Sequence, residues 1–217
     1  MSFQHIIDNA TGLAINKNPL TSLTITRDQT VRSVDRGGAV YRFAVDANIG
    51  MRWSEWRSII TEIEALGKTN TQVINLAKPA FAYITAYTGK LTAPQLAATK
   101  LRYTVAMSAV NTKAFELSTL PSVAANTVIF NAGDIIQPSG SQFPYTVTTT
   151  VLRGINTTVT VPVHRTIRSA PSDTYYSTLA GQQVTWKVIC TQMPTWKITS
   201  YDMVEWGGGF EFYESLV

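Results

Sequence analysis

Histidine and cysteine, the side chains that most often bind transition metals, are scarce in this sequence. His5 and His164 are far apart in the chain, and Cys190 is the one cysteine. A structural zinc site takes about four such ligands. His164 ends a predicted strand, where a surface or interface role is favoured over metal binding. The sequence therefore predicts no metal site, no cofactor and no internal disulfide.

Two glycine-containing segments resemble functional motifs only superficially. Ser139-Gly140-Ser141 lacks the Gly-x-Ser-x-Gly elbow of a serine hydrolase. Gly207-Gly208-Gly209 is followed by Phe210 and Glu211, where a phosphate-binding loop has Lys and then Ser or Thr. The first segment predicts a turn, and the second predicts a bend or bulge between strands.

Paired carboxylates could act as general acid and base, as they do in glycosidases. Glu62 and Glu64 diverge because they are two residues apart on a predicted helix. Glu211 and Glu214 are three apart in a predicted strand and point to opposite faces. Asp134 follows a glycine, where it is expected to hydrogen-bond its own turn. A fold-assembled pair stays open, but the local sequence predicts a protein that is not an enzyme.

The tryptophans offer another kind of chemistry, the stacking of sugar rings. Trp53 and Trp56 begin a predicted helix, whereas Trp186, Trp196 and Trp206 lie in predicted C-terminal strands. Their dispersal among apolar residues favours core packing and subunit contact over a sugar-binding platform.

Charged residues are few, and this bears on the state of assembly. They form 15% of the chain, against roughly 25% in an ordinary soluble domain. Because the mean hydropathy is +0.03, an isolated monomer would leave much neutral surface facing water. The composition therefore favours a subunit that buries surface in an assembly, with a neutral monomeric β domain as the alternative.

The basic residues are scattered. The net charge is +4, and the arginines between residues 27 and 57 are spaced through predicted strands and a helix. Phosphate binding needs a dense cationic patch, so no specific nucleic-acid binding is predicted. The N-terminal sequence lacks a basic segment followed by an apolar run, and no apolar segment approaches the roughly 18 residues of a membrane helix. We expect a chain made in the cytoplasm, without membrane insertion.

Alternating apolar and polar residues predict strands through most of the chain. Residues 20–34 and 39–45 flank Arg36-Gly37-Gly38, which predicts a hairpin with a glycine turn. Residues 54–66 carry apolar side chains at the spacing of one helical face, with Ser54 as N-cap and Gly67 as C′ residue. This is the one convincing helix in the sequence, and a strand is predicted after it at 69–76.

Shorter elements are predicted beyond residue 90. Thr92 begins at most a short helix, with Pro94 in an early position. A hairpin is predicted between residues 145–151 and 157–163, around Gly154. The other predicted elements are strands at 101–107, 113–117 and 128–137, with a tight turn at Ala132-Gly133-Asp134, a loop at 172–182, and strands at 184–190, 196–200 and 209–214.

Several segments resemble structural proteins of bacteriophage tails. Residues 130–138 (FNAGDIIQP), 145–154 (YTVTTTVLRG) and 158–165 (TVTVPVHR) follow one another in an order similar to that of distal tail proteins and baseplate hub components. The segment 206–215 (WGGGFEFYES) resembles the last strand of such proteins. The resemblance is dense over 128–168 and weaker elsewhere, and 80–120 matches no part of the pattern.

This resemblance implies a mainly β fold. The expected architecture is a β-sandwich or split β-barrel with one flanking α-helix, tail-tube-like, plus a β-rich inserted domain. Residues 1–78 would form the first part of the tail-tube-like domain, and 79–183 the insertion. Residues 184–217 would supply the strands that complete the first domain.

The same resemblance implies a virion structural protein that forms a ring at the junction of tail tube and baseplate, after assembly in the host cytoplasm. Its partners would be copies of itself, in a hexamer, and neighbouring tail-tube, baseplate or tail-fibre proteins. The residues assigned to interfaces are Arg36, Tyr41, Trp56, Asp134, Tyr145, Arg153, His164, Arg165, Trp206 and Phe210. Two alternatives stay open: a carbohydrate- or receptor-binding tail module, and a cell-wall hydrolase component.

Overall fold

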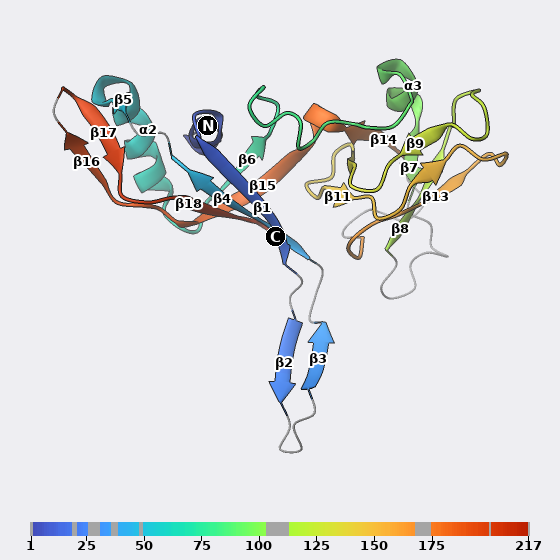
Figure 1. Cartoon of the computed structure of the whole chain (residues 1–217), viewed down its shortest axis with the longest axis horizontal. Helices are drawn as coiled ribbons and strands as arrows, with labels where there is room; N and C mark the ends of the chain where they lie inside the picture. Colours follow the sequence, from blue (N-terminus) through green and yellow to red (C-terminus); the bar gives the residue numbers. More distant parts are fainter. Residues whose placement is uncertain are drawn as a thin grey trace. The chain divides into compact units, whose positions relative to one another are not determined.

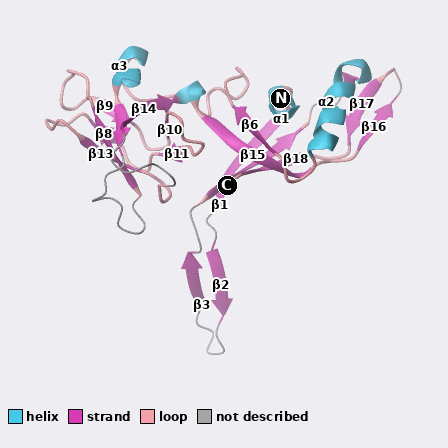
Figure 2. Ribbon diagram, turned by 180° about the vertical axis from the view of Figure 1, so that it is seen from behind, coloured by secondary structure: helices cyan, strands magenta, loops and turns pink. Residues whose placement is uncertain are grey.

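The computed structural model describes residues 2–18, 21–25, 31–35, 39–47, 50–102, 113–167, 175–199 and 201–216. Strands form 41% of the structure and helices 17%, which confirms the predicted mainly β class (Figure 1, Figure 2). The chain divides into two compact units. Unit 1 combines Met1–Ile74 with Lys187–Val217, and unit 2 is Asn75–Trp186. The sequence-based boundaries were placed after residues 78 and 183.

Unit 1 is built on a five-stranded sheet with the order β1-β4-β18-β15-β6. The strand β18 follows unit 2 in the sequence, yet it lies between β4 and β15. Buried and half-buried residues alternate along β4 and β18, so one face of the sheet packs against the core. The five strands are β1 (Gly12–Asn18), β4 (Val40–Asp46), β6 (Thr71–Asn75), β15 (Thr185–Gln192) and β18 (Phe210–Glu214).

The predicted helix is confirmed as α2 (Trp53–Leu66). It begins one residue early, so Arg52 occupies the N-cap position and Ser54 does not cap the helix. Gly67 ends it with a φ of 60° and donates its N–H to the carbonyl of Ile63 at 3.3 Å. A second sheet, β16-β17-β5, accompanies α2 in unit 1 (Figure 1). Its strands are β5 (Met51–Arg52), β16 (Trp196–Thr199) and β17 (Met203–Trp206).

The expectation of a single flanking helix is wrong, because α1 (Ser2–Asp8) also forms in unit 1. Its buried Phe3 contacts Phe212 of β18, with the ring centroids 5.1 Å apart. The N–H of Phe3 donates to the side chain of Gln72 in β6 at 2.9 Å. Tertiary packing, more than helix propensity, therefore holds this short helix.

The predicted N-terminal hairpin is also wrong in its pairing. The strand β2 (Thr21–Ile25) pairs with β3 (Val31–Asp35) as a separate two-stranded sheet. The strand β1 pairs with β4, from Gly12 opposite Asp46 to Asn18 opposite Val40. Alternation identified strand-forming segments here, but it carries no information on which strands pair. The predicted turn at residues 36–38, with Arg36, lies outside the described residues.

Unit 2 contains a six-stranded sheet with the order β11-β10-β14-β7-β8-β13, and a β12-β9 pair. The predicted short helix is α3 (Ala93–Ala98), which begins with a capping box formed by Thr92 and Gln95. A 3₁₀ turn, Gly181–Gln183, follows β14. The strands are β7 (Lys100–Arg102), β8 (Ala114–Ser118), β9 (Val128–Phe130), β10 (Ile135–Pro138), β11 (Tyr145–Thr146), β12 (Val151–Leu152), β13 (Val159–Pro162) and β14 (Tyr175–Ala180).

Two predictions for unit 2 are corrected. The segments 145–151 and 157–163 meet at the bridge Val147–Val163, but β11 pairs with β10, β12 with β9, and β13 with β8. Residues 175–180 form β14 inside the sheet, where a loop was predicted over 172–182. Of the predicted strand 101–107, residues 103–107 lie outside the described part.

Candidate functional site

Four side chains assigned to an interface lie in the core of unit 1. Tyr41, Trp56, Trp206 and Phe210 are each no more than 5% exposed. The ring of Trp56 in α2 contacts that of Trp206 in β17 at 6.0 Å, and Trp206 contacts Phe210 at 4.8 Å. This aromatic row joins α2 to both sheets. The four side chains predicted for an interface are thus buried inside unit 1 and do not present their surfaces to a second subunit.

Tyr145 and Arg165 are likewise part of the core of unit 2. They are 0% and 1% exposed. The guanidinium of Arg165 lies 5.1 Å from the ring centre of Tyr145 and 6.0 Å from that of Phe143. It also donates to the carbonyl of Pro144 at 2.7 Å. A planar, weakly hydrated cation can be buried against aromatic faces in this way, so Arg165 holds the segment 143–145 rather than an external partner.

Asp134 is 3% exposed and belongs to a polar cluster with Thr88 and Asn131, here called the Asp134 cluster. One carboxylate oxygen accepts from the backbone N–H of Thr88 at 3.0 Å and from its hydroxyl at 2.7 Å. The other oxygen accepts from the N–H of Asn131 at 2.9 Å. The predicted turn is present, with Gly133 at a φ of 101°. The carboxylate therefore ties that turn to the segment that carries Tyr87 and leaves no free face for a partner.

The remaining interface candidates are half-buried or outside the described residues. Arg153 donates to the carbonyls of Pro121 at 2.9 Å and Asn156 at 2.8 Å, so it closes its own loop. The Nδ1 of His164 accepts from the N–H of Thr146 at 3.0 Å, which fixes the ring between two segments of unit 2. Arg36 lies outside the described residues.

The carboxylates predicted to diverge do so. Glu211 pairs with Arg42, whereas Glu214 is buried and accepts from the N–H of Tyr41 at 3.3 Å. Glu64 accepts from the indole of Trp196 at 3.1 Å. Within the described ranges, no group of three or more His, Cys, Asp or Glu side chains is placed to hold a metal ion. No helix among those residues is long and apolar enough to span a membrane.

The five-stranded sheet of unit 1 ends in two edge strands. Among the described strands, β1 pairs only with β4, and β6 is the last strand at the other end. Ala14 of β1 is exposed, and Val73 of β6 is 43% exposed. The lysine of β1, Lys17, lies over the ring of Tyr41 at 5.9 Å, and burial lowers its pKa. Lys17 is nevertheless an exposed residue of the β1 edge. Such edges present unpaired backbone groups to other chains.

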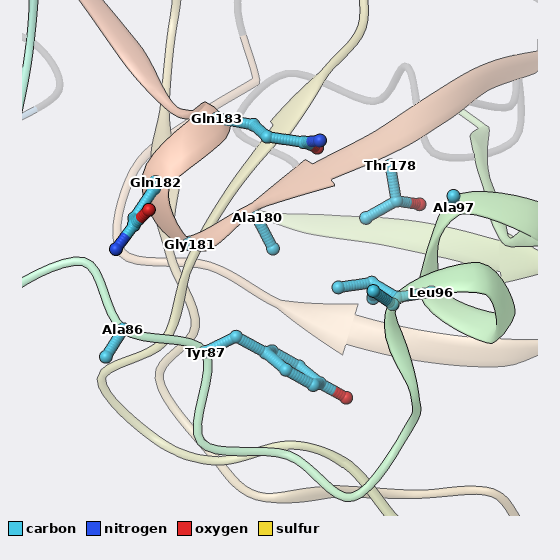
Figure 3. A pocket seen from close by; sticks show the side chains of 10 residues that line it. Ala86, Tyr87, Leu96, Ala97, Thr178, Ala180, Gly181, Gln182 and Gln183 are labelled. Carbon is cyan, nitrogen blue, oxygen red and sulfur yellow. The ribbon is translucent and has the colours of Figure 1, made fainter. Parts of the chain in front are cut away.

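A cavity of about 420 Å³ lies in unit 2, here called the α3 cavity. Leu96 of α3 and Tyr87 point into it from one side, and Gln182 and Gln183 of the 3₁₀ turn lie at its other end (Figure 3). The hydroxyl of Tyr87 donates to the carbonyl of Ile129 at 2.5 Å. Burial raises the pKa of Tyr87 to about 12, so the phenol is neutral. The full lining is Ala86, Tyr87, Ala93, Leu96, Ala97, Thr178, Ala180, Gly181, Gln182 and Gln183.

These walls are apolar and built from small side chains, with amides at the rim. The lining of the α3 cavity contains no carboxylate and no cation, so the cavity is suited to receiving an apolar group with one polar end. The sequence did not point to it, because its residues come from segments that only the fold brings together.

A smaller cavity of about 250 Å³ lies in unit 1, between the end of α2 and β15. Ile63, Lys68, Cys190 and Met193 are among its lining residues. Cys190 is buried and free, as predicted, and burial raises the pKa of its thiol to about 11. The thiol is therefore a packing group and not a reactive one.

Comparison with known proteins adds no relative. No protein-family model matches this chain, and no curated protein matches it.

Proposed function

We propose that this protein is a structural subunit of a bacteriophage tail that assembles through the edges of its five-stranded sheet. The carrying observation is that the sheet begins in β1 and ends in β6, each without an outer partner among the described strands. Backbone pairing of β1 on one copy with β6 on the next would continue this sheet from subunit to subunit.

Such a contact is heterologous, since a different edge is used on each side. Heterologous contacts form a closed ring when the rotation per subunit divides a full turn, and a filament when it does not. A ring of six copies at the junction of tail tube and baseplate is the arrangement that the resemblance to tail proteins favours. Tube, baseplate or fibre proteins would then be the neighbours, and the virion tail its location, after assembly in the host cytoplasm.

The proposal assigns no catalysis to the chain. Two of the carboxylates considered as acid–base candidates lie in separate contacts, Glu211 with Arg42 and Glu64 with Trp196. The buried aromatic row and Arg165 stabilise the fold. Contacts with partner subunits would therefore be made by backbone edges and exposed side chains. Low charge fits this role, because the neutral sheet surface would be covered in the assembly.

The first test is the solution mass of the purified protein by light scattering, with negative-stain images of the same sample. Ala14→Lys and Val73→Lys each place a lysine on one edge, at an exposed position. Each should weaken self-association by roughly tenfold or more, because a lysine on an edge strand opposes pairing. Ile155→Lys, at a side chain 91% exposed in unit 2, is the matched control and should assemble normally.

A wild-type protein that remains monomeric, or edge variants that assemble like wild type, would contradict the edge-pairing mechanism.

The tail location is tested separately. Gold-labelled antibody should mark the end of the tail tube in phage particles from cells that carry this gene, and unlabelled tails would contradict the location.

A second candidate function has one specific observation in its favour. Trp53 and Trp196 are half-buried and stack at 5.0 Å with an interplanar angle of 22°, so each ring keeps one face away from the other. Sugar-binding sites use such faces. Quenching of tryptophan fluorescence by cell-surface glycans, lost in Trp196→Leu but not in Trp186→Phe, would support a carbohydrate-binding tail module. Absence of quenching would contradict the carbohydrate-binding module and leave the structural subunit as the proposed function.

A further inference from the structure

The turn between β16 and β17 carries the most exposed large apolar side chain among the described residues. Tyr201 is 93% exposed. Its φ is 68° and that of Asp202 is 62°, in the left-handed region that aspartate tolerates but that is costly for tyrosine. The sequence thus places a bulky aromatic ring where a smaller residue would be more stable. We call this feature the Tyr201 turn.

The Tyr201 turn is held by its surroundings. Its flanking strands pair in register from Trp196 opposite Trp206 to Thr199 opposite Met203. The hydroxyl of Thr199 donates to the carbonyl of Met203 at 3.1 Å. The N–H of Trp53, at the start of α2, donates to the carbonyl of Asp202 at 2.8 Å. An exposed aromatic ring on a fixed hairpin loses little entropy on binding, as is typical of interface hot spots.

The α3 cavity has the complementary shape and chemistry. Its volume of about 420 Å³ exceeds the space that one aromatic side chain needs. Leu96 and Ala180 supply apolar walls, and Gln182 and Gln183 of the 3₁₀ turn are polar lining residues (Figure 3). An aromatic ring with one polar end is the group that such a lining accepts.

Charge favours a second copy of this chain as the occupant. Unit 2 holds eight Lys and Arg against three Asp and Glu, a net charge of +5, whereas the rest of the chain holds ten against eleven, a net charge of −1. The carboxylate of Asp202 is exposed beside Tyr201. Lys100 is exposed just after α3 and lies opposite Ser177, the neighbour of cavity residue Thr178. Unit 1 of one copy is close to neutral and offers Asp202 to the basic unit 2 of another, whereas two basic units repel each other.

We infer that Tyr201 of one copy inserts into the α3 cavity of the next copy. This rests on the proposed assembly function and names a second contact for it. The contact is heterologous: each copy gives one Tyr201 turn and receives another, so it repeats from subunit to subunit. It does not involve the sheet edges β1 and β6, because Tyr201 lies between β16 and β17 and the cavity is lined by α3, β14, the 3₁₀ turn and the segment of Tyr87.

Two variants remove the two halves of the contact. Tyr201→Asn deletes the ring and suits a positive φ, so the hairpin folds at least as well. Ala97→Trp fills the cavity from an exposed helix position. Each should weaken self-association roughly 30-fold, the loss that corresponds to a hot-spot side chain. Tyr201→Phe and Ala98→Trp are the matched controls, since the first keeps the ring and Ala98 is exposed on α3 but does not line the cavity.

A mixture of the two variants gives the decisive result, measured by sedimentation velocity over a range of protein concentrations. The mixture is made in the Val73→Lys background, where edge pairing is opposed. Tyr201→Asn keeps an open cavity and Ala97→Trp keeps its ring, so each alone should then be a monomer. The equimolar mixture should form dimers and stop there, because the remaining turn and cavity of the pair are both disabled. No dimer in the mixture, or assembly of either variant at wild-type strength, overturns the inference.

The outcomes separate this inference from the proposed function. If rings persist in Tyr201→Asn and are lost in Val73→Lys, the result supports edge pairing and contradicts the Tyr201 contact. If open chains form that depend on Tyr201, without closed rings, the result supports the Tyr201 contact and contradicts the ring. A wild-type protein that is monomeric at every concentration rejects both. A cavity that serves a small molecule or another protein would leave self-association unchanged in Ala97→Trp, which also rejects the inference.

Discussion

Removal of the Asp134 carboxylate should destabilise unit 2 by an amount that the structure defines. Asp134→Ala deletes an acceptor of three hydrogen bonds, two from Thr88 and one from Asn131. A hydrogen bond to a charged group contributes about 1.5–3 kcal/mol. Thr88 is exposed, so water can replace the hydrogen bonds that its N–H and hydroxyl lose. Asn131 is half-buried, so its N–H is less easily satisfied by water. We expect the free energy of unfolding of unit 2 to fall by about 3 kcal/mol.

Urea denaturation followed by far-ultraviolet circular dichroism measures this change. With a slope of about 2 kcal/mol/M, the midpoint of unit 2 should fall by about 1.5 M. Because the two units can unfold separately, hydrogen exchange with mass spectrometry should locate the effect. Peptides that contain residues 87–91 and 128–135 should lose protection first, and peptides of α2 should keep it.

Two milder substitutions bracket the expected result. Asp134→Asn keeps one oxygen for Thr88 but can set its amide against the N–H of Asn131, and should cost about half as much. Thr88→Val removes the hydroxyl, which donates to Asp134 at 2.7 Å and accepts from the Asn131 amide at 3.1 Å, for about 1 kcal/mol because the site is exposed. A midpoint for Asp134→Ala within about 0.3 M of wild type would refute the argument that this carboxylate holds the turn to the Tyr87 segment.

Three further outcomes follow from backbone and burial. Gly67→Ala should lower stability by about 1 kcal/mol, seen as a lower melting temperature, because φ is 60° and no atom lies within 4 Å of the new methyl group; an unchanged melting temperature would contradict this. Burial raises the pKa of Cys190 to about 11, so a disulfide reagent at about pH 8 should modify it only after unfolding; rapid labelling of the native protein would show that the thiol is accessible. Because burial raises the folded-state pKa of Tyr87 to about 12, above its ordinary 10.0, its stabilising contribution is complete below pH 10.0 and is lost as the pH rises through about 12; Tyr87→Phe should flatten the alkaline limb of a stability profile, and an unaltered limb would assign the effect to another group.

The helix α2 could be predicted because its information is local. Trp56, Ile60 and Ile63 recur at helical spacing and are all buried, and Gly67 marks the end. The partners of the strands could not be predicted, since β4 pairs with β1 on one side and with distant β18 on the other. A period of two identifies a strand, whereas its neighbours depend on contacts across the whole chain.

The candidate site was beyond local reasoning for a related reason. Trp206 and Phe210 alternate with polar residues in the same way whether that face meets a core or another subunit, and the structure places them in the core. Arg165 carries a charge and so indicated a surface, but its burial against Tyr145 and Phe143 depends on three segments meeting. The α3 cavity and the Tyr201 turn emerge only from burial and backbone angles.

Because β18 is the central strand of the five-stranded sheet, the order of translation determines when that sheet can be completed. Strand β4 emerges from the ribosome early, but its neighbour β18 is translated about 160 residues later, roughly 10–30 s at ordinary elongation rates. Unit 2 is continuous in sequence and is complete before β18 exists. The five-stranded sheet is therefore finished only at the end of translation. Under the proposed edge pairing, nascent chains on one messenger would be unable to polymerise through a sheet that still lacks its middle strand, and prematurely terminated chains would stay out of the assembly.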